Sequence, residues 1–173
     1  MELKPQDTLL ALKYWSLKYD NLDNSVREIS DAIGISAGEV SKGARRLIKA
    51  HLVVERSGRF YAETGALSEW LCYGVRYAYP QETVGYGRGV ATSWNCALLE
   101  SEMSPPIPAQ VWPYPGGETE GALIRPLHAS VPMAALRDEN IYLALSLLEA
   151  IRGGKPRELK IARGLLTKLI RGK

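Results

Sequence analysis

The chain is poor in the side chains that bind metals and form disulfides. Its 173 residues include two cysteines, Cys72 and Cys96, and two histidines, His51 and His128. Two cysteines this far apart do not make a disulfide framework, and with these histidines they lack the spacing of a zinc site. We therefore expect no metal and no cofactor. So few cysteines also favour a reduced, cytoplasmic environment.

Long apolar runs are also missing. No stretch approaches the roughly 20 apolar residues that cross a bilayer, and no apolar segment follows a basic start as in a signal peptide. Hydrophobic residues nevertheless make up 46% of the chain, which is enough for one domain or two small ones. We expect a soluble cytoplasmic protein without a membrane partner.

The sequence contains no recognisable catalytic constellation. Cys96 and His128 are the only pair worth considering as nucleophile and base, and Ser-Trp-Asn-Cys-Ala around Cys96 fits no nucleophile motif. The glycine-rich stretch Gly85–Gly89 lacks the Gly-Lys-Ser/Thr of a phosphate-binding loop, and we interpret it as an ordinary loop. We therefore expect a protein that is not an enzyme.

Positive charge is present in two places, although the net charge is only +3. Residues 36–61 hold six Lys or Arg against two Glu, and residues 152–173 hold eight against one. Residues 81–151 have the opposite balance, with three Arg against eight Asp or Glu. Such clustering favours an anionic partner at one or both basic segments.

Two helix-capping boxes flank a glycine in the first basic region. Ser25–Glu28 and Ser36–Glu39 each place a serine three residues before a glutamate, so that serine and glutamate can cap each other's N–H groups. Between them, Gly34 in Ile-Gly-Ile can end the first helix. This pattern predicts a helix-turn-helix with helices over 26–33 and 37–50.

The second of these helices has two distinct faces. Its apolar face carries Val40, Ala44, Leu47 and Ile48 at helical spacing. Its other face is small near the start and basic further on: Gly38, Ser41, Lys42, Arg45, Arg46 and Lys49. Small residues can approach base edges while longer cations contact phosphates, as in a recognition helix. An ordinary solvated face is the alternative interpretation.

A basic hairpin follows directly. Strand-like segments at 52–55 and 60–62 are joined through Arg56-Ser57-Gly58-Arg59, with glycine at the tip. We predict a wing whose arginines lie against phosphates or in the minor groove. Alternatively, the two arginines only keep the hairpin soluble. A helix from Pro5 to about Tyr19, ended by a turn over 20–24, is expected to pack behind this unit.

Residues 26–59 resemble the winged helix-turn-helix of the multiple-antibiotic-resistance-type repressors. The resemblance rests on Ile-Gly-Ile-Ser at the turn, Val-Ser-Lys and Arg-Arg-Leu in the third helix, and Leu-Val-Val-Glu-Arg at the entry to the wing. It implies a homodimeric DNA-binding regulator. His51 departs from the family pattern, because members often have glycine at this junction. The flanking segments also differ, so the family's mode of dimerisation does not carry over.

The second half of the chain has weaker signals. A helix is predicted over 67–79, with an aromatic stripe that either packs in the core or lines a pocket. Seven of the ten prolines lie in 105–132, where we predict short strands at 109–112 and 121–125. A helix from Asp138 or Glu139 to Ile151, a break at Gly153-Gly154 and a last helix from Pro156 form a helical hairpin, our candidate dimer element. The basic face of the last helix is solvated, contacts DNA or lies on a membrane.

These observations predict an α+β protein. We expect a winged helix-turn-helix DNA-binding domain over 1–66 and an α+β dimerisation or effector domain over 67–173 that ends in the helical hairpin. The function predicted is a sequence-specific regulator that binds double-stranded DNA, a homodimeric repressor with a palindromic site. The predicted DNA-binding residues are Ser36, Ala37, Gly38, Ser41, Lys42, Arg45, Arg46, Lys49, Arg56 and Arg59.

Two other functions stay open. One is a winged-helix antitoxin or phage-defence component that binds a protein partner and represses its own operon; this rests on analogy between folds. The other is a sensor for a small-molecule effector. Its expected pocket is aromatic and consists of Trp70, Tyr73, Tyr77, Trp94 and Trp112.

Overall fold

The computed structural model describes residues 2–18 and 25–172. The predicted turn over 20–24 lies outside these residues. Helices and two small sheets alternate along the chain, which confirms the α+β class. No helix in the described ranges combines the length and the apolar character needed to cross a membrane.

The N-terminal part consists of three helices and a hairpin. These are α1 (Pro5–Ser16), α2 (Val26–Ile33), α3 (Ala37–Lys49), β1 (Val53–Arg56) and β2 (Arg59–Ala62). The two strands pair antiparallel. The helix predicted to reach Tyr19 ends three residues earlier, and the other elements lie where the capping and turn residues predict them.

A bent helical segment follows the hairpin. It comprises α4 (Thr64–Glu69), the π-turn η1 (Trp70–Gly74) and α5 (Val75–Ala78). This segment replaces the single helix predicted over 67–79. Its inner face buries Leu67, Leu71 and Val75, while Tyr73 and Tyr77 are exposed. Of the predicted aromatic stripe, Trp70 and Tyr79 are half-buried against the core, and the two other tyrosines are exposed.

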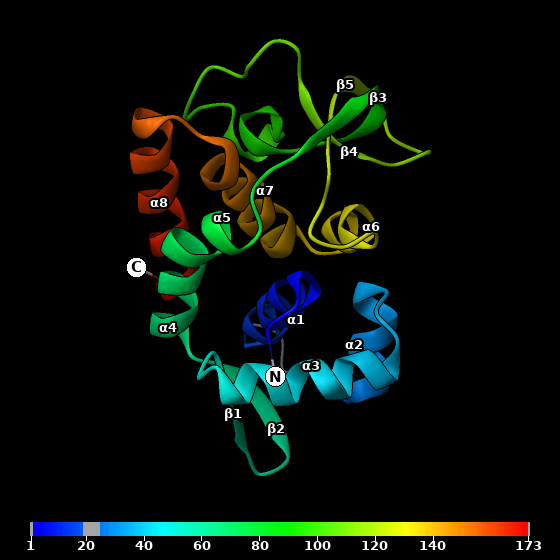
Figure 1. Ribbon diagram of the computed structural model, residues 1–173, viewed down its shortest axis with the longest axis vertical. Helices are drawn as coiled ribbons and strands as arrows, with labels where there is room; N and C mark the ends of the chain where they lie inside the picture. The colour runs from blue at the N-terminus through cyan, green and yellow to red at the C-terminus, as the bar shows by residue number, and fades with distance from the viewer. Residues whose placement is uncertain (1, 19–24, 173) are drawn as a thin grey trace.

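A small three-stranded sheet occupies the far end of the molecule (Figure 1). Its strand β3 (Thr83–Ala91) pairs antiparallel with both β4 (Gln110–Pro113) and β5 (Thr119–Ile124), which pair with each other in parallel. The prediction that Gly85–Gly89 is a loop is wrong. A Cβ at Gly89 would lie 1.9 Å from the Trp112 carbonyl oxygen, so this glycine allows the close approach of two strands.

Two 3₁₀ turns, η2 (Ser93–Asn95) and η3 (Ala97–Leu99), lead from β3 toward β4. The chain ends in α6 (Val131–Arg137), α7 (Glu139–Gly153) and α8 (Pro156–Arg171). Asp138 caps α7, because its Oδ1 accepts hydrogen bonds from the N–H groups of Asn140 and Ile141. The strands predicted before these helices and the break between the last two helices match the structure closely.

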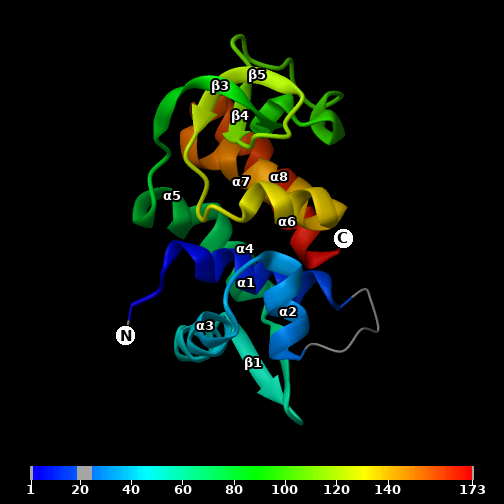
Figure 2. The ribbon, with the colours of Figure 1, turned by 90° about the vertical axis from the view of Figure 1, so that its right-hand side faces the viewer.

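Helix α1 lies in the middle of the molecule, between α2 and α3 on one side and α6 and α7 on the other (Figures 1 and 2). Its buried side chains belong to one continuous cluster that also includes residues of α7 and α8. The indole N–H of Trp15 donates to the Ile170 carbonyl oxygen at 3.1 Å. The predicted boundary at residue 66 thus falls between two parts that share a core.

The helical hairpin of α7 and α8 uses its apolar residues inside the chain. Ala162, Leu166 and Ile170 of α8 are each at most 1% exposed, and Ile141 and Leu148 of α7 are equally buried. Helix α8 packs on α7 and α4. A homodimer that uses this hairpin must therefore do so through residues other than these.

Candidate nucleic-acid interface

A left-handed glycine and two serine caps shape the turn between α2 and α3. Gly34 adopts φ +69°, and the serine before each helix accepts a hydrogen bond from the backbone N–H three residues on. For α3 this bond runs from Glu39 N–H to Ser36 Oγ at 3.3 Å. No reciprocal bond from either glutamate to its serine N–H is formed among the described residues. Each predicted capping box is therefore half made.

The Glu39 carboxylate faces α1 and the cations around it. It accepts from Lys4 Nζ at 3.3 Å and from Gln6 Nε2 at 3.1 Å, and Arg46 Nη2 lies 3.5 Å away. The hydrogen bond from Lys4 and the charges of Lys4, Lys42 and Arg46 hold the pKa of Glu39 below its usual range. Its negative charge at the start of α3 is therefore largely compensated.

One face of α3 remains free of the core. Ser41 is half-buried at its edge, and the exposed residues of the face and of the turn before it are Ser36, Ala37, Gly38, Lys42, Arg45 and Lys49. A Cβ at Gly38 would meet nothing within 4 Å, so packing does not require this glycine. Lys42 lies 3.7 Å from Glu39, while Arg45 and Lys49 make no ion pair with any residue in the described ranges.

Arg46 does not belong to this face, and the prediction that it lies there is wrong. Its guanidinium forms two hydrogen bonds with Asp7, Nε to Oδ2 at 2.7 Å and Nη2 to Oδ1 at 2.8 Å. Arg46 is 6% exposed and Asp7 is 2% exposed. Hydrogen bonding to Asp7 raises the pKa of Arg46 above its already high value. Because neighbouring residues on a helix point about 100° apart, Arg45 faces solvent and Arg46 faces α1.

Asp7 and Gly43 are structural residues that the sequence analysis missed. A Cβ at Gly43 would lie 2.8 Å from Leu10 Cδ2 and 2.9 Å from Asp7 Oδ1, so glycine lets α1 and α3 approach closely. A signal for the ion pair was present. Asp7, Leu10 and Tyr14 lie on the same face of α1. Because this face is apolar and a buried carboxylate requires a partner, Asp7 indicates a buried cation nearby.

The hairpin carries its arginines away from the core. It projects beyond α3 at the end of the molecule opposite the β3–β5 sheet (Figure 1). Arg56 and Arg59 face each other across the turn, and both are exposed. Ser57 and Gly58 at the tip adopt φ +52° and +75°, as a tight two-residue turn requires. Arg56 lies 3.6 Å from the Glu63 carboxylate, in an exposed pair that contributes little stability.

His51 joins α3 to the hairpin with a backbone that favours glycine. Its φ is +60°, and the N–H of Leu52 closes the helix end by donating to the Leu47 carbonyl oxygen at 3.0 Å. His51 thus takes the left-handed conformation that glycine usually occupies, at a small cost in strain.

The remaining candidate residues are dispersed. Trp94 lines a cavity, and Tyr73 lines a groove beside α8. Trp112 is fully buried, and its indole N–H donates a hydrogen bond to the Glu149 carboxylate. The prediction that these and two further aromatic residues line a common pocket is therefore wrong. Cys96 is buried, and His128 lies 2.7 Å from Ser130 Oγ. Within the described ranges, no three His, Cys, Asp or Glu side chains are clustered as a metal site requires.

The face of α3, the turn before it and the basic hairpin are thus the part of the molecule that best matches a site predicted from sequence. Nine of the ten predicted residues lie at this surface, and Arg46 is buried. Comparison of the whole chain with protein-family models, with curated proteins and with solved structures gave no match.

Proposed function

We propose that residues 5–62 form a winged helix-turn-helix that binds double-stranded DNA, and that the protein regulates transcription. One observation carries the proposal. The exposed face of α3 combines small residues with cations that lack a strong ion pair, and a projecting hairpin with two exposed arginines lies next to it.

In the proposed complex, α3 enters the major groove with its N-terminal end foremost. Ala37, Gly38 and Ser41 are small enough to bring the helix close to base edges. Lys42, Arg45 and Lys49 then contact phosphates, and the release of counterions makes this part of the affinity depend on salt. Specificity resides in the first group of residues and affinity in the second.

The two arginines of the hairpin serve as a second contact. Arg56 and Arg59 occupy the wing position, from which they contact phosphates or enter the adjacent minor groove. Their exposure in the free protein means that DNA binding requires no prior opening of a buried ion pair. Arg46 holds α3 against α1 and makes no contact with DNA.

We further propose that the protein binds its operator as a homodimer and acts as a repressor. Two copies of α3 must then lie about one helical turn apart, roughly 34 Å, so the site is a palindrome with half-site centres about 10 bp apart or a multiple of this. The most buried apolar residues of α7 and α8 are used within the chain, so a dimer interface has to use other residues.

Selection of bound fragments from the organism's own DNA, at physiological salt, tests the proposal. A palindromic motif enriched by the wild-type protein, and no motif from an Arg45→Ala/Lys49→Ala variant of equal thermal stability, is the expected result. Wild-type protein that enriches no motif, or a variant that enriches the same motif with equal affinity, contradicts it.

A second function is favoured by a different surface. Tyr73 and Tyr77 of η1 and α5 are 60% and 73% exposed, and the Arg163 guanidinium lies 4.6 Å above the Tyr73 ring. Tyrosine and arginine side chains are enriched at protein interfaces, and the two tyrosines here are exposed. They fit an antitoxin or phage-defence component that binds a protein partner. Co-purification with the product of the adjacent reading frame, lost in a Tyr73→Ala/Tyr77→Ala variant, distinguishes this function.

A further inference from the structure

The groove beside α8 follows one face of that helix. It has a volume of about 530 Å³. Helix α8 lies at the edge of the molecule, with α4 and η1 packed against it (Figure 1). Tyr73 of η1 lines the groove together with residues of α8 spaced three or four apart, namely Pro156, Leu159, Lys160, Arg163, Gly164 and Thr167. These residues extend over roughly 16 Å of helix, the length of about five residues of extended peptide.

The π-turn η1 presents Tyr73 to this groove. The Trp70 ring lies over Gly74, where a Cβ would be 2.3 Å from Trp70 Cε3. The Trp70 indole N–H donates to Thr8 Oγ1 of α1 at 3.1 Å, so the ring is fixed on the inner side of the turn. Tyr73 and, one turn later, Tyr77 are exposed. Single π-turns inside helices are frequent at functional sites.

Arg163 is oriented by two contacts that leave its outer nitrogen atoms available. Its Nε–H donates to the Cys72 carbonyl oxygen at 2.9 Å, and its guanidinium lies 4.6 Å above the Tyr73 ring. Its two Nη groups make no hydrogen bond or ion pair with any residue in the described ranges. An arginine positioned in this way can donate two parallel hydrogen bonds to a carboxylate at little cost in side-chain entropy.

The charges that line the groove are all positive. Lys160 is exposed and forms no ion pair within the part of the chain that the structure describes. Glu69 and Glu158 are the acids closest in sequence to the lining residues, and neither lines the groove. Lys160 and Arg163 therefore present an uncompensated positive charge beside the apolar side chain of Leu159.

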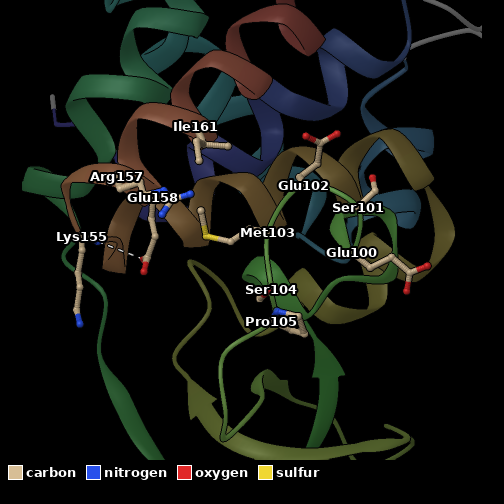
Figure 3. Close-up of a pocket in the computed structure, with 10 residues that line it drawn as sticks. All are labelled: Glu100, Ser101, Glu102, Met103, Ser104, Pro105, Lys155, Arg157, Glu158 and Ile161. Atoms are coloured by element: carbon tan, nitrogen blue, oxygen red, sulfur yellow. Dashed lines mark hydrogen bonds between the residues drawn. The ribbon is translucent and has the colours of Figure 1, made fainter.

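A second opening near the start of α8 has a different charge pattern (Figure 3). It lies between the first turns of α8 and residues 100–105. Lys155 and Arg157 come from α8, while Glu100 and Glu102 come from the other segment. Because charges of both signs line it, this opening does not favour a partner of one sign. The groove with Tyr73 does.

The apolar part of the groove favours a peptide over a nucleic acid. Pro156, Leu159 and the Tyr73 ring can contact an aliphatic side chain, which a nucleic-acid backbone lacks. The guanidinium of Arg163 covers one face of the Tyr73 ring, which leaves less of it for a base to stack on. A Cβ at Gly164 would meet nothing within 4 Å, so the missing side chain leaves room for a peptide backbone.

From these observations we propose that the groove binds an acidic segment of a partner protein, in which an apolar residue lies next to a carboxylate. That carboxylate accepts from the Nη groups of Arg163, a second acid pairs with Lys160, and the apolar side chain contacts Leu159. The inference rests on the protein-binding function proposed for Tyr73 and Tyr77, and it names the chemistry of the partner. It does not depend on DNA binding by α3.

Selection from a random library of twelve-residue peptides displayed on phage, with the full-length protein as bait, provides the first test. The enriched peptides are expected to carry at least two Asp or Glu residues around an apolar residue and few Lys or Arg. A neutral or basic consensus, or no enrichment at all, overturns the proposal.

Fluorescence anisotropy of the best peptide locates its site. Lys160→Glu and Tyr73→Ser are each expected to weaken binding by about tenfold, since each removes a direct contact. Both side chains are exposed, so neither variant removes a core contact. Lys168→Glu makes the same charge change on α8 outside the groove and is expected to change affinity by less than about twofold. Unchanged binding by both groove variants, or an equal loss in Lys168→Glu, contradicts the proposal.

Two further probes test the ligand chemistry. The same peptide with Asn and Gln in place of its acids is expected to bind about tenfold more weakly, because charge-assisted hydrogen bonds are lost. A twelve-nucleotide oligothymidylate is expected to bind more weakly than the peptide. If it binds more tightly and loses affinity in Lys160→Glu and Tyr73→Ser, the groove is a nucleic-acid site and the proposal is overturned.

These outcomes are separable from those of the proposed functions. A neighbouring gene product that co-purifies through Tyr73 and Tyr77, without selection of acidic peptides, keeps the protein-binding function and removes only the acidic segment. Acidic peptides that bind the groove, without a co-purifying neighbour, keep this inference and remove the antitoxin. Neither result affects the selection of DNA fragments by α3.

Discussion

The exposed faces of α3 and α8 are both basic, and they differ in what accompanies the cations. On α3, small residues occupy the N-terminal end and a basic hairpin lies alongside. On α8, Arg157, Lys160, Lys168 and Arg171 form a stripe that begins with a long cation. Both faces attract an anionic polymer, but only α3 can bring its backbone close to base edges. The comparison teaches that the proposed DNA contact rests on the shape of the helix start in addition to charge.

The largest expected effect comes from removing the support of α3. Asp7→Ala leaves the buried Arg46 without its carboxylate, and the Lys4 N–H also loses its acceptor at 2.8 Å. We expect a loss of about 3–5 kcal/mol in the free energy of unfolding. Urea denaturation measures it, with the exposed Asp31→Ala as the control. A loss below about 1 kcal/mol shows that α3 does not need this pair.

The next effect separates the two basic faces directly. Arg45→Ala is expected to weaken binding to any duplex about tenfold and to lower the salt slope by roughly one, as loss of a phosphate contact does. Lys168→Ala on α8 should change affinity less than twofold. Fluorescence anisotropy at several salt concentrations measures both variants. Equal losses would place α8 on the DNA and remove the distinction between the faces.

A smaller effect concerns α6, which packs against the turn before α3. A Cβ at Gly34 would lie 2.9 Å from Ser130 Cβ, and Ser130 N–H donates to His128 Nδ1 at 3.2 Å. Burial lowers the pKa of His128 below its ordinary value of 6.5. The unfolded chain therefore binds this proton more readily, so the stability that neutral His128 contributes is lost as pH falls through about 6.5.

We therefore expect His128→Asn, which stays neutral, to lose less thermal stability than the wild type between pH 7.5 and pH 5.5. Differential scanning calorimetry at both pH values gives the comparison. The same decrease in the two proteins would mean that His128 does not contribute to the pH dependence.

The smallest effect lies at the end of α3. His51→Gly relieves the left-handed backbone and is expected to stabilise the protein by about 0.5–1 kcal/mol, less than the full strain because glycine costs more chain entropy on folding. His51→Ala serves as the control, since alanine keeps the strain. Chemical denaturation in which both variants behave alike would show that the histidine side chain, and not its φ angle, matters.

The N-terminal half was predictable because its signals are local. Ser25, Ser36 and Gly34 specify where α2 and α3 begin and end, and hydrophobic spacing specifies the core face of α3. The burial of Arg46 was not predictable from local signals, because its partner Asp7 is 39 residues away. A charged residue at the border of an apolar face can belong to either side, and only packing decides between them.

The central part was less predictable because its structure depends on contacts distant in sequence. Gly85–Gly89 lacks the alternation of a strand, yet it pairs with two other segments. Gly89 and Gly121 are required by the neighbouring strands, since a Cβ at Gly121 would lie 2.1 Å from the Ala109 carbonyl oxygen. The groove beside α8 combines residues of α8 with Tyr73 of η1, and a linear pattern does not show which segments meet.

The position of α1 also bears on how the protein is made. Trp15 and Ile170 are 155 residues apart, and Lys13 pairs with Asp138 over 125 residues at 3.4 Å. Contacts this distant form only after α7 and α8 have left the ribosome. The contact of α1 with α3 through Asp7 and Arg46 spans only 39 residues, so it can form earlier. A nascent chain can therefore hold α3 against α1 before α7 and α8 cover the other side of α1.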